Sequence, residues 1–265
     1  MKTFIYLLFA LSFYACNSDN EKEKKSLSKI ENSPFDGLNI PDSIKKDFNK
    51  YLILSLKKYF QIDEREDYII DSINLTINNN QVIEKIYTVN RLSKAKKDLV
   101  NSNNPAKFLE LGMIGNYNNL IFYNPRTNAF HTPMSFPSSP YLGLIVNQIS
   151  LSNSDNIEIS VIYRIRDAAF KNFYHLNQDN IELVFSSKLF DNLKKVNPQA
   201  YYIEINETSP YEKFKNINVY EANISKPKND DDLNLFIPKL SKTNKLLNEF
   251  FYNQKEKKYY YKAKS

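Results

Sequence analysis

The chain has 265 residues and a formal charge of +6, with 42% hydrophobic and 14% aromatic residues. This apolar content is enough to bury a core, so we expect a folded chain apart from its ends. One cysteine, two histidines and four glycines exclude a Cys-x-x-Cys redox motif, a zinc site built from cysteines, and the glycine-rich loops that bind phosphates or dinucleotides. The lysines are scattered rather than clustered with arginines and aromatic residues, so we expect no nucleic-acid partner.

The N-terminal segment has the features of an export signal. One lysine precedes an apolar run from Phe4 to Tyr14, and a small residue, Ala15, then precedes Cys16. The run is shorter than the roughly 20 residues that cross a bilayer, and it fits the hydrophobic region of a cleavable signal. Cys16 is the only cysteine in the chain. A plain signal peptide followed by a chance cysteine is the alternative interpretation.

The junction of Ala15 and Cys16 resembles the lipobox of bacterial lipoproteins, in which the cysteine is diacylated and becomes the new N-terminus. Phe13 stands where that family usually has leucine. The resemblance implies a signal peptide over residues 1–15 and attachment to the outer membrane through the lipid on Cys16. The segment Ser18-Asp19-Asn20-Glu21 resembles the acidic export signal of flavobacterial lipoproteins in the Bacteroidetes, which implies exposure on the cell surface. An ordinary polar tether is the alternative.

Residues 16–34 are polar and low in complexity, which predicts a flexible tether. We expect residues 35–265 to form a single domain, with a split near residues 124–141 as the alternative. A helix is predicted to begin at Pro41. Its apolar stripe recurs at helical spacing and consists of Ile44, Phe48, Leu52, Leu56 and Tyr59.

The next segments predict a β-hairpin followed by helices. Residues 68–77 and 81–89 alternate and are rich in β-branched residues, which is typical of paired strands. Helices are predicted over residues 91–100 and 105–111, and a short strand over residues 120–123. Four basic residues on the first of these helices are interpreted as a solvated face, with an anion site as the alternative: Arg91, Lys94, Lys96 and Lys97.

Residues 124–141 contain four prolines and no regular period, which predicts a long, stiffened loop. Loops of this length in a compact domain are often functional. Arg126 and His131 are its candidate binding residues. A catalytic Ser/His pair in the loop would need a carboxylate and an oxyanion hole. The sequence announces neither, so it assigns no catalytic residue.

The second half of the chain is predicted to be rich in strands. A hairpin is expected from residues 142–151 and 156–165, and the tail 255–265 is expected to be an edge strand or a frayed end. Further strands are predicted over residues 181–185, 201–205 and 217–222. Helices are predicted over residues 166–176, 186–196 and 238–251. Because helices and strands mix without a β-α-β repeat, the predicted fold class is α+β, with antiparallel sheets, packed helices, an N-terminal amphipathic helix and a C-terminal helix.

We expect no metal and no cofactor. The two histidines, His131 and His175, lack the spacing of a metal site, and His175 is interpreted as structural. Asp230-Asp231-Asp232 lacks the glycine and the spaced ligands of a calcium loop. The run precedes an apolar segment, so it is interpreted as a turn or the start of a helix.

Two functional hypotheses follow. The first is a lipid-anchored, non-enzymatic protein of the cell envelope that binds an envelope protein or a polymer at the outer membrane. The sequence does not separate this role from that of a structural subunit of an envelope machine. The second hypothesis is a lipid-anchored hydrolase whose site is formed around residues 124–141.

Overall fold

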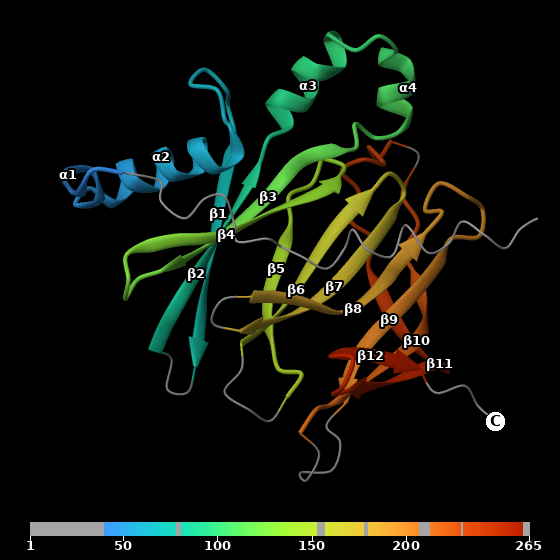
Figure 1. Ribbon diagram of the computed structural model, residues 1–265. Coiled ribbons are helices and arrows are strands. Elements are labelled where there is room, and N and C mark those ends of the chain that lie inside the picture. Colours follow the sequence, from blue (N-terminus) through green and yellow to red (C-terminus); the bar gives the residue numbers. More distant parts are fainter. Residues whose placement is uncertain are drawn as a thin grey trace, which may run out of the picture. The chain divides into compact units, whose positions relative to one another are not determined.

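Most of the described chain is β-strand. The computed structural model (Figure 1) describes residues 40–77, 81–152, 157–177, 180–206, 213–228 and 230–261. The signal segment, Cys16 and the tether lie outside the described residues. All the elements below belong to one compact unit, Pro41–Ser265.

The expected α+β fold with packed helices is wrong, because strands account for 53% of the structure and helices for 16%. The strands form two antiparallel sheets in which each strand pairs with its neighbours in the chain, so both sheets are meanders. The four-stranded sheet contains β1 (Ile69–Ile77), β2 (Gln81–Asn90), β3 (Gly115–Asn124) and β4 (Ala129–Ser138). The eight-stranded sheet contains β5 (Ile145–Ile149), β6 (Ile157–Ile165), β7 (Ala168–Asn177), β8 (Asn180–Asp191), β9 (Gln199–Asn206), β10 (Asn216–Ile224), β11 (Leu240–Asn253) and β12 (Lys258–Tyr261).

The helices of the described residues lie in the first half of the chain. They are α1 (Asp42–Lys45), α2 (Phe48–Phe60), α3 (Leu92–Val100) and α4 (Pro105–Glu110). The predicted N-terminal helix is interrupted at Asp47, whose side chain accepts a hydrogen bond from the backbone N–H of Lys50 and caps α2. Tyr51 of α2 donates a hydrogen bond to the carbonyl of Asn128, and the centroids of the Tyr51 and Phe130 rings lie 5.0 Å apart. The buried stripe of α2 therefore packs on the β3–β4 hairpin.

The predicted loop over residues 124–141 is also wrong, because most of it belongs to the β3–β4 hairpin. The side chain of Asn124 accepts a hydrogen bond from the backbone N–H of Arg126 at 2.9 Å and closes the turn. The prediction was wrong because it took the prolines as evidence against a strand. Strand β4 lies at the edge of its sheet, where a residue without an N–H is tolerated, so Pro133 and Pro137 fit within the strand.

Three predicted helices in the second half are strands instead. Residues 166–176 correspond to β7, residues 186–196 to the end of β8 and the turn after it, and residues 238–251 to β11. Strand β7 is buried on both faces, as Phe173 and Tyr174 illustrate, so no polar alternation marks it. Strand β11 has two register shifts against β10, and these interrupt the period of two.

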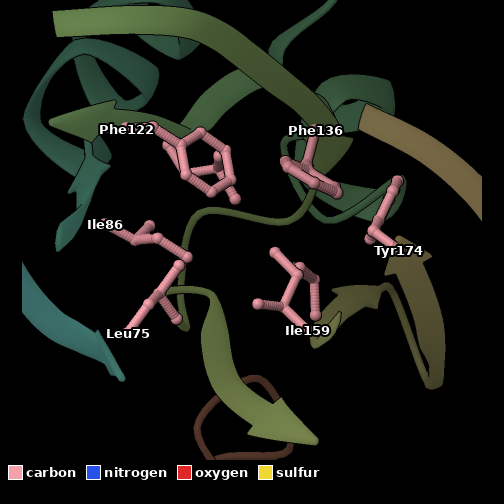
Figure 2. Close-up of a cluster of buried hydrophobic side chains, with 8 residues drawn as sticks. Leu75, Ile86, Phe122, Phe136, Ile159 and Tyr174 are labelled. Atoms are coloured by element: carbon pink, nitrogen blue, oxygen red, sulfur yellow. The ribbon is translucent and has the colours of Figure 1, made fainter. Parts of the chain in front are cut away.

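One hydrophobic core lies between the two sheets (Figure 2). Its buried members are Leu75, Ile86, Leu120, Phe122 and Phe136 from the four-stranded sheet and Ile159, Val161 and Tyr174 from the eight-stranded sheet. A second core lies within the eight-stranded sheet, where β8 and β9 pair at only two positions. Phe173 and Phe185 pack there with Ile217 and Tyr259. The last four strands therefore share one core with β7 and β8.

Candidate functional site

The two candidate binding residues both lie in the β3–β4 hairpin, but in different surroundings. Arg126 is in the turn and its side chain is exposed. His131 is on β4 opposite Phe122, and its half-buried ring stacks on that phenylalanine with centroids 5.7 Å apart. Among the described residues, no hydrogen bond or ion pair joins the two side chains. The hairpin therefore does not bring Arg126 and His131 into one site.

His131 is instead the middle member of a chain of polar groups. Its Nε2 lies 3.3 Å from Oε1 of Glu84 on β2, and its Nδ1 lies 3.1 Å from Oγ1 of Thr132. Thr132 has a φ of 48°, which is unusual for a β-branched residue, and it sits at a register shift between β3 and β4. A hydroxyl, an imidazole and a carboxylate in this order form the proton-transfer arrangement of a nucleophilic triad. Sequence reasoning missed Glu84, because a whole strand separates it from His131.

A second candidate region lies on β9–β12 and was not found from the sequence. On β9 and β10, Ile203, Ile217 and Val219 pack into the second core. Because side chains alternate along a strand, the residues between them point away from that core. We call the side chains on this side the outer face: Tyr202, Glu204, Asn218, Tyr220, Leu246, Glu249, Phe251 and Tyr260.

Strand register arranges the outer face in rows. Tyr202 pairs with Tyr220 across β9 and β10, and Tyr220 pairs with Leu246 across β10 and β11. Phe251 of β11 pairs with Tyr260 of β12. Between 38% and 47% of the surface of Tyr202, Leu246, Phe251 and Tyr260 is exposed. Phe251 and Tyr260 thus reach solvent side by side, and Tyr202 and Leu246 reach it on either side of Tyr220.

Charged and amide side chains occupy the centre of the outer face, around the Tyr220 ring. The Nζ atom of Lys242 lies 3.8 Å from the centroid of the Tyr220 ring and 2.7 Å from Oε2 of Glu204. The hydrogen bond to Glu204 raises the pKa of Lys242. Asn218 is 6% exposed and donates to the hydroxyl of Tyr220 at 3.2 Å. The Tyr220 ring is therefore fixed on two sides while its neighbours in the row stay accessible.

His175 lies on β7 rather than near a helix end, beside a buried carboxyl group. Its Nδ1 is 3.7 Å from Oε1 of Glu158, which is 1% exposed. Glu158 accepts hydrogen bonds from the hydroxyl of Ser152 and from the backbone N–H of Leu151. Burial raises the pKa of Glu158, and these hydrogen bonds oppose the shift. The group ties β6 to the segment that follows β5.

The raised pKa of Glu158 predicts a pH dependence of stability. The folded chain holds this proton more tightly than the unfolded chain, so the stabilisation is complete below the ordinary carboxyl pKa of about 4.3 and is lost as the pH rises through the folded-state pKa. Glu158→Gln removes this pH-dependent contribution to stability, because glutamine does not titrate. We therefore expect the free energy of unfolding of the variant to increase relative to wild type between pH 4 and pH 7 in urea titrations. A difference that stays constant with pH would contradict the assignment.

The acidic run at residues 230–232 is held by local hydrogen bonds. Carboxylates of Asp231 and Asp232 accept backbone hydrogen bonds from Lys228 and Asn234, so the run forms turns. Within the described ranges, no group of three or more His, Cys, Asp or Glu side chains converges as a metal site.

No helix in the part of the chain that the structure describes is long and apolar enough to cross a membrane. Comparisons with protein-family models, with curated proteins and with solved structures found no match.

Proposed function

We propose that this chain is a lipid-anchored protein of the cell envelope that binds a partner protein through the outer face of β9–β12. The single observation that carries the proposal is that two groups of apolar side chains are exposed on the same side of β9–β12: Tyr202 and Leu246, which flank Tyr220, and the pair of Phe251 and Tyr260. Exposed apolar side chains that gather on one face mark interaction sites more often than singly scattered ones do.

Two features of the sequence support the proposed anchor. Cys16 stands at the position that the lipobox modifies, and the polar tether from residue 16 to residue 34 would carry the domain away from the membrane. We place the protein at the outer membrane, on its external side. Protease treatment of intact cells would then digest the domain, whereas protection until lysis would place it on the inner side.

The composition of the outer face favours a protein over a polymer as the partner. Tyrosine and phenylalanine are enriched in protein–protein interfaces, and the central anchors of an interface are usually aromatic. Glu204 and Glu249 lie in the register row of Asn218, between the two apolar groups, and Lys242 contacts both Tyr220 and Glu204. Charged groups within an interface support specificity and the rate of association more than they support affinity.

A double variant tests the proposal. Tyr202→Ser with Phe251→Ser removes two aromatic anchors, so we expect the affinity for the partner to fall by about 30-fold or more. The matched control is Val100→Ser with Val196→Ser, which removes two apolar side chains that are 79% and 81% exposed elsewhere. The readout is the mass of the native complex in envelopes solubilised with a mild detergent.

Each outcome of that experiment is decisive. The proposal expects a complex whose excess mass is not a multiple of the chain's own mass, lost in the double variant and retained in the control. A wild-type protein that migrates alone, a complex made only of its own copies, or equal loss in both variants would overturn it.

A second candidate function, a hydrolase, is favoured by the chain of Thr132, His131 and Glu84. In that case His131 would take the proton of the Thr132 hydroxyl and Glu84 would orient the ring. His131→Ala would then lower the rate of hydrolysis of a simple ester by about 100-fold or more. Arg126→Ala in the same hairpin is the control. Equal rates in wild type and His131→Ala would sink this candidate.

A further inference from the structure

A charged cavity of about 250 Å³ lies beside α3, away from both regions described above. It is formed by the end of α2, the segment after it and one side of α3. The residues that line it are Gln61, Asp63, Arg65, Glu66, Ser93, Lys94, Lys97 and Asp98. Six of these eight side chains are ionisable, so the cavity is suited to a small charged ligand rather than an apolar one.

The floor of the cavity includes Glu66, which belongs to a buried ion pair with Arg91. Arg91 donates to both carboxylate oxygens of Glu66, with Nε at 2.5 Å and Nη2 at 2.7 Å, and the two side chains are 8% and 7% exposed. A third donor of Arg91 reaches the carbonyl of Phe60 at 2.9 Å. The charge of Glu66 is therefore cancelled within the protein, and this carboxylate does not repel an anion in the cavity.

A second ion pair occupies one wall. Lys94 binds both carboxylate oxygens of Asp98, at 2.9 and 3.0 Å, and the hydroxyl of Tyr117 donates to the same carboxylate. Burial, together with this hydrogen bond, raises the pKa of Tyr117 to about 12, so its hydroxyl remains a donor. Lys94 and Asp98 thus also neutralise each other in a fixed geometry.

Outside these two ion pairs, the lining has two cations, Arg65 and Lys97, and one anion, Asp63. Arg65 and Lys97 are exposed, and within the described residues neither forms an ion pair. Asp63 already accepts a hydrogen bond from the backbone N–H of Arg65 at 3.0 Å. The hydroxyl of Ser93 adds a neutral donor to the same lining. The cavity therefore keeps an excess of positive charge and of hydrogen-bond donors.

We propose that this cavity binds a small anionic group, a phosphate or phosphate ester, between Arg65 and Lys97 with Ser93 as an additional donor. Guanidinium and ammonium groups form charge-assisted hydrogen bonds with phosphate oxygens. The volume admits a group of this size but no large ligand. Only part of the predicted basic cluster serves the site, because neither Arg91, which is bound to Glu66, nor Lys96 is among the lining residues.

Calorimetric titration of the mature protein in non-ionic detergent tests the site. The probes are inorganic phosphate and glycerophosphoglycerol, the soluble headgroup of an anionic phospholipid, at constant ionic strength. We expect saturable binding of one molecule per chain. Arg65→Gln with Lys97→Gln should weaken it by about tenfold or more. Lys96→Gln, which removes one exposed charge from the same helix as Lys97, should change it by less than about twofold.

The two probes also distinguish the source of the ligand. Tighter binding of glycerophosphoglycerol assigns the site to a lipid headgroup, and tighter binding of phosphate assigns it to a free anion; either result supports the proposal. The absence of saturable binding for both probes would overturn it. Equal weakening by Lys96→Gln and by the double variant would also overturn it, because only the general charge of this surface would then matter.

Discussion

Replacing Glu66 by alanine is expected to lower the free energy of unfolding by about 3–5 kcal/mol. The reason is that Arg91 is 7% exposed and would keep its charge in the protein interior without the carboxylate that neutralises it. Its remaining hydrogen bonds are to neutral carbonyls of the α2 C-terminus, at Phe60 and Gln61. Urea denaturation at pH 7 measures the effect.

The matched control is Glu64→Ala, which removes an exposed carboxylate two residues away. Surface substitutions of this kind usually change stability by less than about 0.5 kcal/mol. If Glu66→Ala were no more costly than Glu64→Ala, Arg91 would have to reach water. The ion pair at the floor of the charged cavity would then not be closed as described above.

The second large effect is expected for Phe122→Ala. Phe122 is fully buried and lies in the core between the two sheets, facing the residues shown in Figure 2. Truncating a buried phenylalanine costs about 3–5 kcal/mol, because contacts are lost and the cavity closes only in part. The His131 ring stacks on the Phe122 ring, so the truncation also removes this contact. Thermal and urea unfolding should both report the loss.

Phe251→Ala is the matched control for that prediction, and it also bears on the proposed function. Phe251 is 39% exposed on the outer face, so its truncation should change stability by less than about 0.5 kcal/mol. A loss as large as that of Phe122→Ala would mean that Phe251 supports the fold. The outer face would then be a structural surface rather than a binding surface.

The first half of the fold could largely be predicted from the sequence. Strands β1 and β2 and helix α3 are confirmed at nearly the predicted residues. In these segments the apolar pattern matches one period, because one face is buried and the other meets solvent. Asp47 is the local exception: it caps α2 and divides the predicted helix in two.

The second half could not be predicted for a physical reason. Strand β7 is buried on both faces, and β11 is irregular opposite Tyr220 of β10, so neither shows a clean period of two. In β11 the apolar residues Leu247, Phe250 and Phe251 happen to fall at helical spacing. The prediction of a C-terminal helix followed from that coincidence.

The candidate regions depend on strand register, which the sequence does not display. Glu84 on β2 and His131 on β4 come close together only because both of their strands pair with β3. Tyr220 meets Leu246 only because β11 pairs with β10, and the predicted helix concealed that pairing. A sequence shows which residue types are available, whereas long-range pairing decides which of them become neighbours.

The most direct test of the central proposal is site-specific photo-crosslinking in living cells, with a photoreactive amino acid at position 251. We predict one covalent adduct with a distinct envelope protein. We also predict that the adduct disappears when Cys16→Ala removes the acceptor of the lipid, and that a probe at Val196 yields no such adduct. Failure to form an adduct at position 251, or an adduct that Cys16→Ala leaves unchanged, would contradict a lipid-anchored protein that binds through its outer face.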